Sequence, residues 1–190
     1  TAGNQLPYID TVIRHKANKT EMISTKAATG EATVAGNNLK VTEIPLYKKN
    51  EAQENYKTLF YTSGRSSWLA IQPNFTSKKE QLREVLHEAD FRKALSHAIN
   101  REDINNKVFF GRAVPMQSTV LPMSKYYKEE YANAFIEHNP QKAEELLDKL
   151  GMKDVNGDGF REYPNGDTFK PTFIYMTGSG PRTPILELVI

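Results

Sequence analysis

Four residues in the first half of the chain could line a site for a small ligand: Tyr61, Arg65, Trp68 and Asn74. They surround the apolar run 68–71, and Trp68 is the only tryptophan in the sequence. Aromatic walls with a few polar groups are typical of small-molecule sites. The alternative is that Trp68 packs into the core, where large aromatic side chains are usually found.

A second candidate is the loop 154–162, which is rich in acidic residues and glycine. Asp154, Asn156 and Asp158, followed by Gly159, match the first half of a calcium-binding loop. Such a loop needs a bidentate glutamate at its twelfth position, which is Asn165 here. A glycine-rich turn explains the same residues, because Asn and Asp tolerate left-handed backbone.

Residue types that would support catalysis do not come together in the sequence. The four histidines are scattered, with no pair at i and i+4, and no Gly-x-Ser-x-Gly elbow occurs. The chain contains no cysteine, which excludes disulfides, thiolate nucleophiles and cysteine-based zinc sites. We therefore expect no catalytic residue, no metal ligand and no cofactor, and a hydrolase is the weakest of the alternatives.

Composition narrows the class of protein further. The 190 residues include 25 basic and 23 acidic side chains, which give a net charge of +2. A nucleic-acid-binding protein usually carries a clustered basic surface, so we expect no nucleic-acid partner. No apolar run approaches the roughly 18 residues that predict a membrane span.

Helix signals are strongest between residues 77 and 150. Phe91, Ala94, Leu95, Ala98 and Ile99 recur at the spacing of one buried helix face, with His97 on another face. The expected N-caps are Ser77, Asn100 and Asn139, and the expected helix ends are Gly111 and Gly151. Further helices are expected at 20–29 and from residue 184 onward.

Strands are expected where β-branched and aromatic residues cluster. The segments are 8–14, 33–35, 41–47, 60–71, which a turn at 63–67 interrupts, and 172–176. The last expected helix would bury Ile185, Leu188 and Val189 over about two turns, which is short for a helix. We therefore expect the polypeptide to continue beyond Ile190, the alternative being a short helix docked in a groove.

One stretch resembles a known family. Residues 90–101, Asp-Phe-Arg-Lys-Ala-Leu-Ser-His-Ala-Ile-Asn-Arg, are similar to the signature D-x-R-V-R-x-A-L-S-x-A-I-D-R of family 5 extracellular solute-binding proteins, with Asn100 in place of the usual Asp. These proteins are the peptide-, dipeptide- and nickel-binding receptors of ABC importers. Flanking stretches also resemble the family, in its order: 69–74, 111–122, 139–147 and 154–162.

The resemblance implies an α+β fold in which helices pack on a mixed sheet. This would be the second lobe, of the domain 3 type, of a periplasmic-binding-protein-like II fold. Residues 1–190 would form a single domain, most of the C-terminal lobe of a larger two-lobed protein, truncated at the C-terminal helix.

The resemblance also implies a function without catalysis. A peptide or similar small solute would be held between two lobes by hinge closure and passed to ABC permease subunits. The protein would act outside the cytoplasmic membrane, in the periplasm or on the outer face, through an anchor outside this chain if it has one. Because the strand before the signature lies near the cleft in this family, Tyr61, Arg65, Trp68 and Asn74 are the expected ligand-binding residues. The alternative is an extracellular module that binds calcium, or is stabilised by it, through the 154–162 loop.

Overall fold

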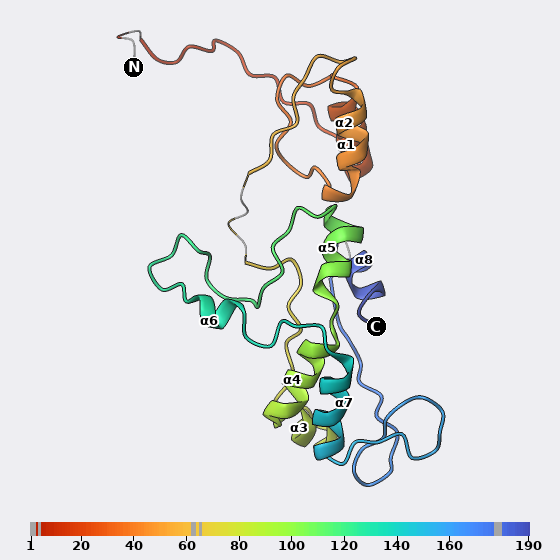
Figure 1. Cartoon of the computed structure of the whole chain (residues 1–190). Coiled ribbons are helices and arrows are strands. Elements are labelled where there is room, and N and C mark those ends of the chain that lie inside the picture. Colours follow the sequence, from red (N-terminus) through yellow and green to blue (C-terminus); the bar gives the residue numbers. More distant parts are fainter. Residues whose placement is uncertain (1–2, 4, 62–63, 65, 177–179) are drawn as a thin grey trace. The chain divides into compact units, whose positions relative to one another are not determined.

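The computed structural model describes residues 3, 5–61, 64, 66–176 and 180–190. The chain divides into two compact units, residues 1–59 and 60–190, and each is described by itself. Within the described ranges the ordered elements are helices (Figure 1), together with a single antiparallel bridge between Glu162 and Thr168. None of the helices in these ranges has the length and apolar character needed to cross a bilayer.

The first unit is built on two packed helices, α1 (Thr20–Ala28) and α2 (Ile44–Asn50), with the short 3₁₀ turn η1 (Val41–Glu43) before α2. The buried Tyr47 hydroxyl donates to Ser24 Oγ at 2.8 Å and so ties α2 to α1. The predicted extended segment 41–47 is wrong, because Pro45 lies in the first turn of α2, where its missing N–H is no loss.

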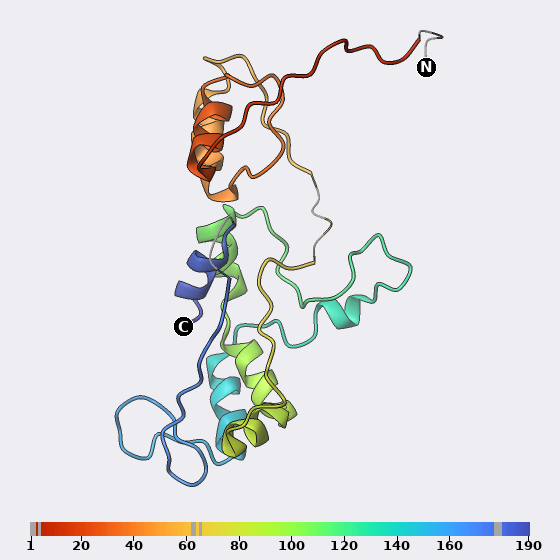
Figure 2. The ribbon, with the colours of Figure 1, turned by 180° about the vertical axis from the view of Figure 1, so that it is seen from behind.

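The second unit is centred on α4 (Ala89–Ala98) packed against α7 (Pro140–Lys149), with α3 (Glu80–His87) beside α4 in both views (Figures 1 and 2). Ala94 is 1% exposed and contacts the cluster formed with Ala143 and Leu146. These small side chains let the two helices approach closely, and larger apolar residues close the core around them. These larger residues form a second core cluster, which comprises Val85, Phe91, Met152 and Tyr163.

Three shorter helices complete the second unit: α5 (Arg101–Phe109), α6 (Glu129–Ala132) and α8 (Arg182–Glu187). The predicted caps are confirmed for α5 and α7. Asn100 Oδ1 accepts the N–H of Asp103 at 2.9 Å, and Asn139 Oδ1 accepts the N–H of Lys142 at 2.9 Å. The helix end predicted at Gly111 is confirmed too, since α5 stops at Phe109.

The predicted end of α7 at Gly151 is also confirmed. Gly151 has φ +73°, and its N–H donates to the carbonyl of Asp148 at 3.0 Å. The N–H of Met152 donates to the carbonyl of Leu147 at 3.0 Å, which completes a Schellman motif. The motif turns Met152 back into the core, where it is 1% exposed.

Two helix predictions need correction. The helix expected from Ser77 begins at Glu80, and Ser77 Oγ accepts the N–H of Lys79 at 3.3 Å, so no capping box forms. His97 is buried, with Nδ1 3.0 Å from the carbonyl oxygen of Glu137, whereas Ala98 is exposed. The segment around Glu137, which covers His97, lies 40 residues later in the sequence. The periodicity of the helix therefore could not predict that His97 is buried.

The predicted mixed sheet is not present among the described residues, and none of the five predicted segments is a strand there. A strand needs a neighbour for its backbone N–H and C=O groups. Among the described residues Thr172–Met176 has no such neighbour, although its exposed fractions alternate as they would on a pleated strand. They are 41% for Phe173, 95% for Ile174, 43% for Tyr175 and 77% for Met176.

The last helix also differs from its prediction. It begins at Arg182 and buries Ile185 and Leu186, while Leu188 is 39% exposed. Its buried residues lie side by side in sequence because the helix is only six residues long and contacts α5 on one side.

Enlarging Ala94 tests the packing of α4 on α7. We expect Ala94→Leu to lower the free energy of unfolding by about 1–3 kcal/mol, because the added carbons have no space between the helices. Ala98→Leu, on the exposed side of the same helix, is the matched control and should change stability by less than about 0.5 kcal/mol. Urea unfolding followed by circular dichroism measures both, and equal losses would contradict this packing.

Acid should weaken the first unit through Glu51. Lys48 Nζ and the backbone N–H of Thr58, at 2.8 and 2.6 Å, lower the pKa of Glu51 to about 2. Because this pKa is below the value of the unfolded chain, the stabilisation is complete above about pH 4.5 and is lost as the pH falls towards 2. Following the Glu51 carboxyl resonance by NMR against pH should give a midpoint near 2.

The variant Glu51→Gln should flatten the acid dependence of the first unit's stability, measured from the urea unfolding of α1 and α2 resonances. Asp10→Asn, at an exposed position, is the control and should leave that dependence unchanged. A Glu51 midpoint near 4.5 would show that its hydrogen bonds do not favour the ionised form.

Candidate functional site

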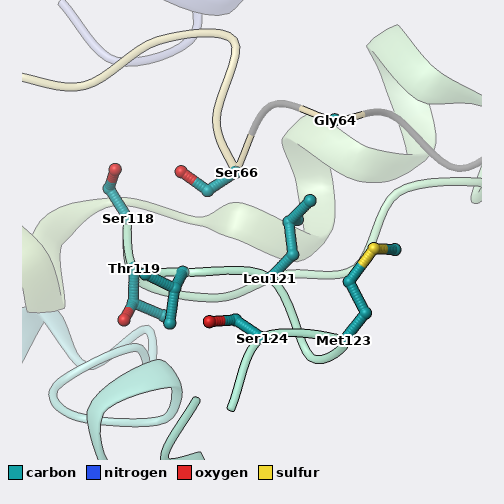
Figure 3. A pocket seen from close by; sticks show the side chains of 8 residues that line it. Gly64, Ser66, Ser118, Thr119, Leu121, Met123 and Ser124 are labelled. Atoms are coloured by element: carbon teal, nitrogen blue, oxygen red, sulfur yellow. The ribbon is translucent and has the colours of Figure 1, made fainter. Parts of the chain in front are cut away.

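A cavity of about 630 Å³ lies in the second unit, between Gly64 and Ser66 on one side and the loop 118–124 on the other (Figure 3). We call it the 118–124 cavity. Figure 3 shows Leu121 reaching from the loop towards the segment that carries Ser66. The residues that line it are Gly64, Ser66, Ser118, Thr119, Val120, Leu121, Met123 and Ser124.

Gln117 holds the start of this loop in place. Its side-chain amide donates to Ser96 Oγ and to the carbonyl of Ala134, both at 2.8 Å. Its backbone N–H donates to the carbonyl of Ala132 at 2.8 Å. Further back, the N–H of Ala113 donates to Asn105 Oδ1 at 2.8 Å. The loop is therefore fixed to α5 before the cavity begins and to the segment after α6 at Gln117.

Ser96, on α4, connects this loop to the rest of the unit. Its hydroxyl donates to the carbonyl of Phe135 at 2.6 Å and accepts from Gln117 and from Arg101. Arg101 also donates to the carbonyls of Ser96 at 2.8 Å and Ile136 at 3.4 Å. Burial lowers the pKa of the Arg101 guanidinium, which is surrounded by carbonyl and hydroxyl oxygens. The segment 96–101 of the signature thus positions the wall of the cavity.

The lining of the 118–124 cavity suits an uncharged polar ligand. Four hydroxyl groups can donate and accept hydrogen bonds, and three apolar side chains offer contact area. No Asp, Glu, His, Lys or Arg side chain is among the described residues that line it. A serine without a neighbouring base is a weak nucleophile. The lining therefore offers hydrogen bonds and apolar contact, and its described residues include no group for acid–base chemistry.

The structure does not bring the predicted ligand-binding residues together in this cavity. Tyr61 is 83% exposed, and Arg65 lies outside the described residues. Asn74 Oδ1 accepts the N–H and the hydroxyl of Thr76 at 3.1 and 3.0 Å, so it closes a turn. Trp68 is 37% exposed and lies against Gly180, where an added Cβ would come within 3.3 Å of its ring.

The 118–124 loop is the part of the site that was not predicted from the sequence. Its sequence, Ser-Thr-Val-Leu-Pro-Met-Ser, carries hydroxyls and apolar residues around Pro122, and this mixture was the available signal. Neither periodicity nor a motif indicated that Ser66, some 50 residues earlier, would face it. The hydrogen bonds of Gln117 and Ala113 hold the start of the loop.

The 154–162 loop does gather carboxylates. One carboxylate oxygen from each of Asp154, Asp158 and Glu162 lies within 4.8 Å of the others. Glu162 is buried and was not predicted, while the expected twelfth-position residue, Asn165, donates to Asp167 Oδ2 at 2.7 Å instead.

Backbone and amide donors already fill this carboxylate group. Asp154 accepts the N–H groups of Gly157 and Gly159 at 2.7 and 2.9 Å. The Asn156 amide nitrogen lies between Asp158 Oδ2 and Glu162 Oε1, at 3.2 and 3.0 Å. A donor therefore stands where a cation would have to be, which favours the glycine-rich turn.

Calcium should accordingly leave the stability of this chain unchanged. We expect thermal unfolding in millimolar calcium and in chelator to give the same Tm, because the Asn156 amide already satisfies the carboxylate oxygens. Magnesium at the same concentration controls for ionic strength. A Tm that rises with calcium alone, and not in Asp158→Asn, would establish the calcium site.

Sequence comparisons identify relatives of the whole chain. The family described as bacterial extracellular solute-binding proteins, family 5, matches residues 2–190. The oligopeptide-binding protein AppA of Bacillus subtilis (strain 168) is 27% identical over 185 residues, covering 96% of this chain and 31% of AppA. The periplasmic alpha-galactoside-binding protein of Rhizobium meliloti (strain 1021) is 25% identical over 174 residues, covering 87% of this chain and 25% of that protein.

Solved structures give the same result. An oligopeptide-binding protein OppA is similar at a TM-score of 0.60 and 32% identity, over 80% of this chain and 25% of that one. The periplasmic oligopeptide-binding protein of an oligopeptide ABC transporter from Thermotoga maritima is similar at a TM-score of 0.55 and 27% identity, over 82% of this chain and 28% of that one. The chain therefore spans between a quarter and a third of the length of these relatives.

Proposed function

This chain belongs to the bacterial extracellular solute-binding proteins of family 5, and from that membership we propose that the complete protein is the substrate-binding component of an ABC importer. It would bind a peptide or a similar small solute outside the cytoplasmic membrane and deliver it to ABC permease subunits. The names of the relatives support this role, since three are named oligopeptide-binding proteins and one is named an alpha-galactoside-binding protein.

The observation that carries the proposal is the 118–124 cavity. Its hydroxyl groups match the N–H, C=O and O–H groups of an uncharged peptide backbone or a sugar, and Leu121 and Met123 add apolar contact. A cavity with this lining binds without activating its ligand, so we propose a receptor and not an enzyme. Trp68, Asn74, Tyr61 and Arg65 remain proposed contributors to the same cleft in the complete protein.

We also propose that residues 1–190 form most of the C-terminal lobe. The complete protein would supply neighbours for the extended segments, which would then join a mixed sheet. The alternating exposure of Thr172–Met176 supports this, because alternate side chains of a strand point to opposite faces of a sheet. Hinge closure of two lobes around the solute would bury the ligand, and one lobe alone would bind weakly.

Calorimetry tests this proposal. We expect the complete protein to bind members of a mixed peptide pool, and the 190-residue chain alone to bind them on the order of a hundredfold more weakly. In the complete protein, Leu121→Ala should weaken binding by about tenfold through the loss of a buried apolar contact. An alpha-galactoside titrated in parallel distinguishes a sugar receptor from a peptide receptor.

The matched control is Val114→Ala on the segment that precedes the loop, at a position that is 78% exposed and outside the cavity. It should leave the affinity unchanged. Tight peptide binding by the 190-residue chain would overturn the two-lobe mechanism. Equal affinity of Leu121→Ala and the unmodified protein would remove the 118–124 cavity from the binding site.

A further inference from the structure

Met123 carries the one readily oxidised side chain among the described residues that line the 118–124 cavity. The other lining residues are glycine, serine, threonine, valine and leucine, which contain neither sulfur nor an aromatic ring. The sequence has no cysteine, so its five methionines are its only sulfur groups. Oxidation of a methionine thioether to a sulfoxide turns a flexible apolar side chain into a polar one.

Two successive turns hold Met123 at the tip of the loop. The N–H of Ser124 donates to the carbonyl of Leu121 at 2.8 Å, and the N–H of Tyr127 donates to the carbonyl of Ser124 at 3.0 Å. Pro122 and Met123 are the two central residues of the first turn, and a proline is favoured at the position that Pro122 takes. Met123 is 76% exposed, and Figure 3 shows its sulfur near the free end of a side chain that extends away from the loop backbone. An oxidant in solution can therefore reach this sulfur.

Two other methionines provide contrasts within the same unit. Met176 is 77% exposed, as open to solvent as Met123, but it does not line the cavity. Met152 is 1% exposed and lies in the core cluster with Phe91. Since susceptibility to oxidation follows exposure, Met123 and Met176 should react before Met152. Comparing these residues separates oxidation in the cavity from oxidation elsewhere in the unit.

We propose that Met123 is an oxidation site that regulates how tightly the 118–124 cavity holds its solute, an inference that rests on the proposed function of this cavity. The oxidant is a hydroperoxide. Its terminal oxygen forms a bond to the thioether sulfur while the O–O bond breaks, and its proton moves to the departing oxygen, which leaves as water or an alcohol. The sulfur loses two electrons in this step.

The sulfoxide changes what the cavity offers a solute. Its oxygen accepts hydrogen bonds from water or from the hydroxyl groups of the wall, so the apolar contact of Met123 is lost. The change is reversible, because a methionine sulfoxide reductase supplied with a dithiol returns the thioether and releases water and a disulfide. Met123 therefore gives the cavity a high-affinity reduced state and a low-affinity oxidised state.

Peptide mapping by mass spectrometry tests the first step on the 190-residue chain. After graded treatment with hydrogen peroxide, we expect Met123 and Met176 to gain oxygen while Met152 stays a thioether. Oxidation of Met123 only together with Met152 would mean that the sulfur is reached through unfolding, and would overturn the proposal.

Calorimetry on the complete protein tests the effect on binding, with the tightest-binding member of the peptide pool as the probe. Peroxide treatment should weaken binding by about tenfold, through the loss of an apolar contact. Met123→Leu, which has a similar volume and no sulfur, is compared with its own affinity before peroxide, and that affinity should not fall. Met176→Leu is the matched control and should lose as much affinity as the unmodified protein. Treatment with reductases for both sulfoxide epimers should restore binding.

Three results of the binding experiment would overturn the proposal. The first is an unchanged affinity once mapping shows that Met123 is oxidised. The second is an equal loss in Met123→Leu and in the unmodified protein, which would place the effect at another residue. The third is a loss that the reductases do not reverse. A complete protein that binds no member of the pool before peroxide would overturn the proposed peptide binding itself, and with it this regulation.

Discussion

The close packing of α4 against α7 is the contact on which the rest of the second unit depends. Ala94 and Ala143 are almost fully buried there, and their small size sets how near the helices lie. One end of this pair carries Ser96, which fixes the 118–124 loop through Gln117. The other end carries Met152, which closes the core beneath Tyr163. The 118–124 cavity is therefore positioned from one end of this helix pair.

In this arrangement the helices that form the core and the loop that lines the 118–124 cavity are different segments. The signature segment 90–101 contributes packing and a network of hydrogen bonds, while the cavity wall comes from a loop whose start is held by Ala113 and Gln117. Loops on a rigid scaffold commonly carry binding functions because they can vary without loss of the core. A receptor family that accepts peptides and sugars on one fold would use this division, since loop residues can change while the helix pair stays the same.

The extended apolar segments explain why the strand predictions failed. Thr172–Met176 has the composition and the alternating exposure of a strand, yet it has no backbone partner in the described chain. The composition of a segment indicates whether its side chains suit a strand. A sheet also needs a second segment that pairs with the backbone N–H and C=O groups of the first. The relatives are three to four times as long as this chain, and only the proposed complete protein would supply such a second segment.

The sequence by itself determined the features that depend on neighbours three or four residues away. The caps at Asn100 and Asn139, the helix end at Gly151 and the family signature were all readable, because their hydrogen bonds and periodicity are local. Ser77 was the local exception, since its hydroxyl turned to Lys79 and left the start of α3 open.

Tertiary structure decided everything that joins distant segments. It buried His97 under the loop at Glu137, brought Glu162 to Asp154, and set Ser66 opposite the 118–124 loop. It also placed Asn74, a predicted ligand-binding residue, in a local turn outside the 118–124 cavity. These outcomes depend on which surfaces meet once the helices pack, and such contacts leave no period or spacing in the sequence for a local rule to detect.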